Sequence, residues 1–223
     1  GSAADPSGAI AHNLQPQSSR EFILGMEHRF SNRIRAGAYF THRKLDDVVE
    51  DLTVDFGARA YCITQGFSEA ACTAAYPGGS NWVIANPGRD VTVRINPLPD
   101  GSTPTVTLAA ADLLYDKPIR KYNALTLTFD REFDGVWGVS STYTWAMDKG
   151  NYEGGVRSDN GQLSVNRVSD FDSPGFQNGS YGYLPNDRRH TFKAYGSYRP
   201  FEFLDLGANM TVRAGRSYRC IGS

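Results

Sequence analysis

The sequence lacks any run of apolar residues long enough to cross a membrane as a helix. Such a helix needs about 18 or more consecutive apolar residues. The nearest candidate, residues 106–114, is short and is interrupted by Asp112. This absence excludes a membrane-spanning helix only, because a strand of a membrane barrel alternates apolar with polar residues and therefore contains no long apolar run.

An excess of charge and a catalytic motif are also missing. The formal net charge is -1, whereas a protein that binds nucleic acid through its phosphates shows a clear basic excess. The histidines are dispersed along the chain. Neither a metal-binding HExxH motif, nor a phosphate-binding loop, nor a nucleophile motif occurs. We therefore expect no nucleic-acid partner, no cofactor and no enzymatic activity.

Cysteine is scarce, and its three occurrences are unevenly placed. Cys62 and Cys72 lie close together in a polar stretch, whereas Cys220 lies near the end of the sequence. We interpret the close pair as a short-range disulfide formed in an oxidising compartment. Two unrelated thiols are the alternative. The odd cysteine indicates that Cys220 has its partner outside this chain.

The sequence is rich in glycine, tyrosine and phenylalanine, with 23, 12 and 12 residues respectively. This composition favours strands over helices. Six segments alternate between apolar and polar residues with a period of two, as where Leu24 and Met26 alternate with Gly25 and Glu27. The alternation predicts strands at about 20–30, 34–50, 119–133, 137–148, 189–199 and 203–217.

The connections between the expected strands differ greatly in length. Within each of three hairpins the turn is short, whereas the connections between hairpins cover about 56–116 and 150–187. Loops of compact soluble domains rarely exceed about 12–15 residues. Outer-membrane barrels have short turns at one end and long extracellular loops at the other. The pattern is typical of such a barrel.

The chemistry of the two faces of the expected strands also indicates a barrel. One face carries Leu, Phe, Val and Met, the other carries Thr, Ser, Asn and charged residues, and aromatics such as Phe133, Trp137 and Tyr122 lie near strand ends. Soluble antiparallel sheets also alternate, so alternation alone leaves both possibilities open. Together with the connection lengths and the aromatic placement, it favours an all-β, antiparallel transmembrane β-barrel segment.

Several motifs that follow one another along the chain carry a resemblance to a known family. They are EFILGMEHRF at 21–30, RKYNAL at 120–125, NYEG at 151–154, RSDNGQ at 157–162 and LPNDRRH at 184–190. This ordered series resembles the C-terminal barrel portion of Oar-like TonB-dependent outer-membrane receptors. Any one of the motifs would be weak, but their order is fairly specific.

The resemblance implies a barrel of about 22 strands whose lumen is filled by a plug domain. Residues 1–223 would then form a partial β-barrel domain of about six strands, and the plug is absent from this chain. Six strands cannot close a ring of that size and would leave two open edges in lipid. We therefore expect this chain to be one piece of a larger barrel or assembly. The stretch 56–112 has no counterpart in the resemblance.

The resemblance also implies a function, which is the import of a ligand across the outer membrane of a Gram-negative bacterium with energy from the inner membrane. The expected partners are outer-membrane lipid, the rest of the barrel with its plug, an unidentified ligand, and the TonB complex acting through regions outside this chain. The long loops would face the cell exterior. Two alternatives remain open: a structural or adhesive barrel that transports nothing, and a soluble β-rich binding module.

Aromatic residues in the long connections are the candidates for ligand contact, because exposed rings on loops commonly supply binding area. Each ring has an alternative role, which is to fold its loop onto itself. The four residues are Tyr76, Trp82, Tyr152 and Phe176.

Acidic residues of the second long connection are weak candidates for metal binding. Carboxylates such as Asp159, Asp170 and Asp172 are the ligands that a hard cation prefers. Their spacing fits no EF-hand loop, and Asp also stabilises turns through its own backbone. We therefore predict no metal site.

Overall fold

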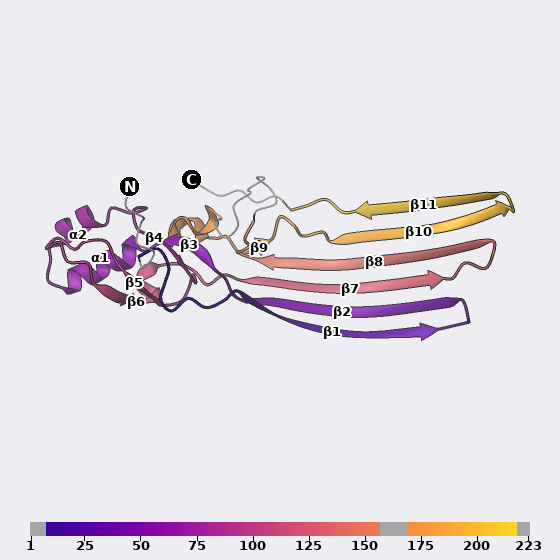
Figure 1. Ribbon diagram of the computed structural model, residues 1–223, viewed down its shortest axis with the longest axis horizontal. Coiled ribbons are helices and arrows are strands. Elements are labelled where there is room, and N and C mark those ends of the chain that lie inside the picture. Colours follow the sequence, from indigo (N-terminus) through magenta and orange to yellow (C-terminus); the bar gives the residue numbers. More distant parts are fainter. Residues whose placement is uncertain (1–7, 157–168, 218–223) are drawn as a thin grey trace.

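The computed structural model describes residues 8–156 and 169–217. It consists of a long antiparallel sheet with a compact folded unit at one end (Figure 1). The long strands lie in the order in which they occur along the chain, so each pairs with its neighbours in sequence. They are β1 (Ser18–Arg29), β2 (Ile34–Asp47), β7 (Arg120–Arg131), β8 (Trp137–Gly150), β10 (His190–Phe201) and β11 (Leu204–Arg213).

The expectation of antiparallel β structure is confirmed. All pairs of neighbouring long strands are antiparallel, and the short β9 (Gly182–Tyr183) adds to the end of β8. Within the described residues the sheet stays open, with β1 and β11 at its two edges. β2 is shorter than the expected 34–50, because the chain leaves the sheet at Val48 and buries that side chain in the folded unit.

The register of the sheet places apolar side chains of neighbouring strands side by side on one face. Leu24 pairs with Phe40, Phe40 with Leu125, and Leu125 with Trp145. Because paired residues of antiparallel strands share a face, we call this the apolar face. Its large members are Phe22, Leu24, Met26, Phe40, Leu125, Leu127, Phe129, Tyr143, Trp145, Phe192, Leu206, Met210 and Val212.

The opposite face, which we call the polar face, carries hydroxyl, amide and charged groups. Thr126 and Thr144 are cross-strand neighbours whose hydroxyl oxygens lie 3.2 Å apart. Thr128 pairs with Thr142, which pairs in turn with Lys193. The alternation in the sequence is therefore the alternation of two chemically different surfaces.

Nothing in the described chain covers the apolar face. Met26 is 71% exposed and Leu127 is 44% exposed. The buried apolar cluster contains no residue of the six long strands. The sheet thus has no hydrophobic core of its own, and its large apolar surface is exposed.

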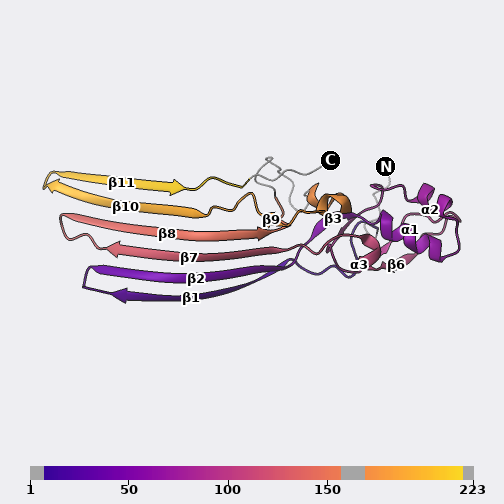
Figure 2. The ribbon, with the colours of Figure 1, turned by 180° about the vertical axis from the view of Figure 1, so that it is seen from behind.

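Short turns and long connections lie at opposite ends of the sheet (Figures 1 and 2). At the end with the short turns, the Asp134 carboxylate shapes the β7–β8 turn by accepting hydrogen bonds from the N–H groups of Val136 (2.9 Å) and Trp137 (3.0 Å). Gly135 in the same turn has a φ of 100°, a conformation that strongly favours glycine.

At the other end, the connections form a folded unit that we call the cap, comprising residues 8–17 and 48–119 and the described part of 151–189. The stretch expected to be one long loop at 56–116 contains three helices and short strands. Two antiparallel strand pairs, β3–β4 and β5–β6, accompany the helices. The elements are β3 (Glu50–Thr53), α1 (Asp55–Thr64), α2 (Glu69–Ala75), β4 (Trp82–Ala85), β5 (Val91–Arg94), β6 (Thr105–Leu108), α3 (Ala110–Leu113), η2 (Ser169–Phe171) and η3 (Pro174–Gln177).

The cap is held together by a hydrophobic core, which the sheet lacks. Leu52, Ala58 and Val93 are completely buried, and the N-terminal segment joins them through Ala11. That segment lies along β4, where the Ala11 N–H donates to the Ile84 carbonyl over 2.9 Å. No helix in the described ranges has both the length and the apolar character needed to cross a membrane.

The expected disulfide is present. Cys62 on α1 and Cys72 on α2 are bonded and completely buried. The Ser68 hydroxyl caps the start of α2 by accepting from the Ala71 N–H over 3.3 Å. The disulfide therefore joins two short helices, which are also linked by the Arg59 guanidinium donating to the Tyr76 carbonyl over 2.6 Å.

Replacing both cysteines, Cys62→Ala with Cys72→Ala, should loosen these helices selectively. Closing a loop of this size stabilises a fold by about 3 kcal/mol. Backbone amides of α1 and α2 should therefore exchange with deuterium much faster, as measured by mass spectrometry of peptides from 55–75. The internal control is β7–β8, whose exchange should not change. Equal protection of α1 in both proteins would contradict the prediction.

Candidate functional site

Two of the four aromatic residues proposed for ligand contact are interior residues. Tyr76 is completely buried, and its hydroxyl donates to the Asn96 carbonyl over 2.7 Å. Burial raises its pKa to about 12. Tyr152 is also completely buried. These two rings take the alternative role given above and fold the cap, because a side chain without exposed surface offers a ligand nothing to contact.

The other two aromatic residues remain accessible. Trp82 is 40% exposed, and its indole N–H donates to the Gly79 carbonyl over 2.9 Å, which fixes the ring on the cap surface. Phe176 in η3 is 37% exposed. The two rings lie on separate elements of the cap, β4 and η3.

Tyr152 links the two long connections that form the cap. Its hydroxyl donates to Oε2 of Glu50 over 3.3 Å, and Glu50 is completely buried. Its ring packs edge-on against Phe171 at 5.7 Å between centroids, and Phe171 lies 6.4 Å from Tyr115. Burial, and then the adjacent Glu50 carboxylate, raise the pKa of Tyr152, so its hydroxyl stays protonated and able to donate.

Asp55 is the polar centre of the cap. Its carboxylate is fully buried and accepts hydrogen bonds from the Ser80 N–H (2.7 Å), the Asn81 side-chain amide (2.6 Å) and the Thr53 hydroxyl (2.9 Å). Burial alone would raise the pKa of this carboxyl, but these hydrogen bonds together hold it below its usual range. The carboxylate thereby fastens the turn before β4 to the start of α1.

Arg120 joins the cap to the top of the sheet. Its guanidinium donates to the Asp148 carboxylate, with Nη2 2.7 Å from Oδ2, and to the Glu153 carbonyl. The Asp148 N–H in turn donates to Oδ1 of Asp187 over 2.7 Å. Asp148 and Asp187 are both buried, so this network fixes where the strands end and the cap begins.

A cleft lies on the polar face directly beside this network. Two adjoining hollows, of about 340 and 350 Å³, share Tyr122, Asp148 and Asn186 in their walls. The rest of the lining combines basic side chains with hydroxyl groups, so the cleft suits an anionic or hydroxyl-rich ligand group. The basic side chains are those of Arg43, Arg120, Arg188, Lys193 and Arg213.

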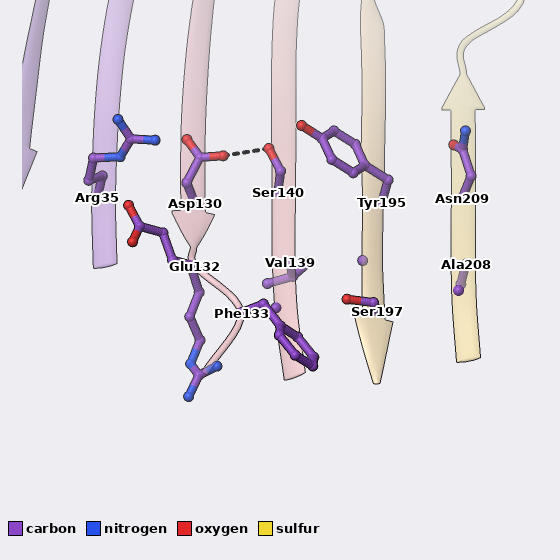
Figure 3. A pocket seen from close by; sticks show the side chains of 14 residues that line it. Arg35, Asp130, Glu132, Phe133, Val139, Ser140, Tyr195, Ser197, Ala208 and Asn209 are labelled. Carbon is purple, nitrogen blue, oxygen red and sulfur yellow. Dashed lines mark hydrogen bonds between the residues drawn. The ribbon is translucent and has the colours of Figure 1, made fainter. Parts of the chain in front are cut away.

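A second hollow, of about 610 Å³, lies on the polar face near the short turns (Figure 3). One cross-strand row runs through it, from Arg35 through Asp130, Ser140 and Tyr195 to Asn209. The Ser140 hydroxyl donates to the Asp130 carboxylate. Charges of both signs and hydroxyl groups therefore line this end of the face.

The acidic residues considered as weak metal ligands do not assemble into a site in the described ranges. No group of three or more His, Cys, Asp or Glu side chains there is arranged to hold a metal. Asp170 lies in η2 and is 2% exposed, and its carbonyl accepts from the Gln177 side chain. Asp159 and also Cys220 lie outside the described residues.

Sequence reasoning missed the groups that organise the cap. Asp55, Glu50 and Arg120 gather partners from up to 102 positions away. Only one local signal existed, which is Asp55 two residues after Thr53, a spacing at which a carboxylate and a hydroxyl often share a turn. The basic cleft had no local signal, because its cations come from β2, β7, β10 and β11.

Comparison with known proteins gives one curated relative. The chain is 28% identical over 207 residues to the TonB-dependent transporter Oar of Myxococcus xanthus. This stretch covers 93% of the chain but 15% of the transporter's length. No family model matches the chain, and no solved structure matches it. The similarity supports a distant relationship to TonB-dependent receptors.

Replacing Asp55 by Ala should destabilise the cap by about 3 kcal/mol, because hydrogen bonds to a buried charged group are strong and their donors would lose their acceptor. Amide hydrogen exchange of residues 54–82 measures the effect. The matched control is Asp100→Ala, since Asp100 accepts only from Ser102 two residues away in the described structure. An equal effect of both substitutions would refute the central role of Asp55.

The same carboxylate predicts a pH dependence. The folded-state pKa of Asp55 lies below its value in the unfolded chain, so its stabilisation is complete above about pH 4 and is lost as the pH falls through the folded-state pKa. Exchange in the cap should accelerate at low pH in the unmodified protein more than in the Asp55→Ala variant, after correction for the intrinsic exchange rate.

Proposed function

We propose that this chain forms part of the wall of a transmembrane β-barrel in the outer membrane of a Gram-negative bacterium, with the cap on the extracellular side. We further propose that this barrel belongs to a TonB-dependent transporter. The observation that carries the proposal is the apolar face, which runs uncovered across all six long strands.

The apolar face suits lipid and does not suit water. Soluble monomers rarely expose contiguous apolar patches larger than a few hundred Å². Here the exposed large side chains include Phe22, Leu24 and Leu127 in the middle of long strands. The strands have 10 to 14 residues, and about 9–11 residues suffice to cross a bilayer at a tilt of about 45°. Trp137, the first residue of β8, fits an interfacial position.

The two free edges support a larger barrel. Edges in lipid would leave backbone N–H and C=O groups without partners, and each such group costs several kcal/mol there. β1 and β11 therefore need further strands from the rest of the protein or assembly. A complete ring of about 22 strands, as proposed from the resemblance, would enclose a lumen wide enough for a plug domain.

The cap fits the extracellular side because all long connections gather there, as in outer-membrane barrels. Its disulfide fits an oxidising environment. Under this arrangement the polar face lines the lumen. The basic cleft below the cap is where an incoming ligand would meet the wall, and the mixed-charge hollow near the short turns is where the wall would meet the plug.

The transport role rests on the relative, which is named as a TonB-dependent transporter. The ligand, the TonB complex, the plug and the remaining strands are the partners proposed for this chain. Trp82 and Phe176 on the cap surface remain proposed ligand contacts, because they combine an apolar ring with accessibility.

A pair of cysteine variants on one strand tests the orientation of the wall. Leu127 and Thr128 are adjacent on β7 but lie on the apolar and the polar face. In outer membranes that contain the full-length protein, Leu127→Cys should react with a lipid-dissolved maleimide and resist a membrane-impermeant one. Thr128→Cys should show the reverse preference. Reaction of both cysteines with the impermeant reagent would indicate a soluble module and refute the proposal.

The same Thr128→Cys variant tests transport. If a plug moves within the lumen when TonB pulls on it, labelling of this cysteine in living cells should change when the proton-motive force is collapsed. The control is Leu127→Cys with the lipid-dissolved reagent, which should not respond. An energy-independent rate at Thr128→Cys would favour a structural barrel without transport.

A further inference from the structure

A row of basic residues crosses the sheet on the same side as the apolar face, at the end nearest the cap. Arg20 pairs with Lys44, Lys44 with Lys121, and Lys121 with Lys149. These pairings place one cation on each of four neighbouring strands in a line across the sheet. We call these four residues the basic row.

The basic row continues directly from the apolar face. Lys121 and Leu125 lie four residues apart on β7, and Lys149 and Trp145 lie four apart on β8. This spacing corresponds to about 13 Å along a strand, or about 9 Å along the membrane normal at a tilt of 45°. The cations therefore stand just beyond the apolar band, at the depth where lipid headgroups begin.

Most of the positive charge in the row is not neutralised by the protein. Arg20 forms an ion pair with Asp46 at 2.6 Å, which leaves little net charge at that end. Within the described part of the chain, Lys44, Lys121 and Lys149 form no ion pair. Lys44 and Lys121 are exposed, and Lys149 is half-buried.

At the β8 end of the row, the ring of Tyr183 contacts two cations. Tyr183 pairs with Lys149, whose ammonium nitrogen lies 4.3 Å from the ring centroid. The Arg189 guanidinium lies 4.5 Å from the same ring, and its other partner is Asp187 at 3.4 Å. The ring thus orders Lys149, while Arg189, which is paired with Asp187, adds little net charge beside the row.

This arrangement is unfavourable for the protein alone. Like charges directly opposite each other on paired strands repel and destabilise the sheet. Here Lys121 has a lysine opposite it on both sides. A bound anion that touches several of these ammonium groups would convert the repulsion into attraction, and a line of cations beside an apolar surface suits an anion that carries hydrocarbon chains.

We propose that the basic row binds the phosphate groups of an anionic glycolipid in the outer leaflet, while its acyl chains lie against the apolar face. This inference rests on the proposed function, because it requires the apolar face to contact lipid. Charge complementarity and the continuity of the row with the apolar face select this occupant. Each lysine near an anionic membrane surface contributes about 1 kcal/mol.

The test compares two double variants of the full-length protein in detergent. Lys121→Gln with Lys149→Gln removes two cations from the basic row. Arg29→Gln with Arg33→Gln removes two exposed cations at the short-turn end of the sheet, away from the row and outside the basic cleft, so both variants lose equal charge. The probe is fluorescent bis-phosphorylated lipid A. The row variant should bind it about 30-fold more weakly, because two lysines contribute about 2 kcal/mol, whereas the variant at the short-turn end should bind it like the unmodified protein.

Lipid A without its phosphates should bind the unmodified protein as weakly as bis-phosphorylated lipid A binds the row variant. Equal affinity of both variants, or of both lipids, would overturn the inference. The Leu127→Cys labelling pattern, repeated in the row variant, separates the two proposals. If Leu127→Cys reacts only with the lipid-dissolved reagent but lipid A binding does not differ, the glycolipid site alone is refuted. Labelling by the impermeant reagent defeats the membrane wall and the glycolipid site together.

Discussion

The cross-strand register of the six long strands is the constraint on which the rest of the structure depends. Once Leu24, Phe40 and Leu125 are aligned, every other side chain is assigned to a face, because successive residues of a strand point to opposite sides. A slip of one residue between β2 and β7 would put lysines and threonines among the apolar residues. The alignment therefore decides which surface of the sheet is apolar and which is polar.

The cap is stabilised differently, by a buried hydrophobic core. Its connections are too long to remain stable as bare loops, so they bury a core of their own, in which Leu52, Val93 and Phe171 have no exposed surface. The buried polar groups in and beside that core form hydrogen bonds with one another. Asp55 accepts from three residues, and Arg120 links the cap to the sheet. The cap is thereby fixed to the strand ends, beside the cleft on the polar face.

The sequence predicts the sheet well and the cap poorly, for a physical reason. A period of two over ten residues is a local signal, and it identifies the strands and both faces. The Cys62–Cys72 bond was predictable because its partners are close in sequence. The packing of Tyr152 on Phe171 and its bond to Glu50 depend on residues brought together only after the sheet has aligned β2, β7 and β8. Tyr76 and Tyr152 therefore looked like surface residues of a loop.

The basic row shows the same limit most clearly. In the sequence, Lys44, Lys121 and Lys149 are three separate charges near strand ends, and each alone suggests nothing beyond solvation. They become one surface only because of the register. The alignment that pairs Phe40 with Leu125 and Leu125 with Trp145 also pairs the lysines, which lie four residues nearer the cap on each strand. The apolar band and the cationic line are therefore consequences of a single register. Any shift that relieved the repulsion between the lysines would also break the apolar face, whereas a bound counter-anion would stabilise the row and leave that face intact.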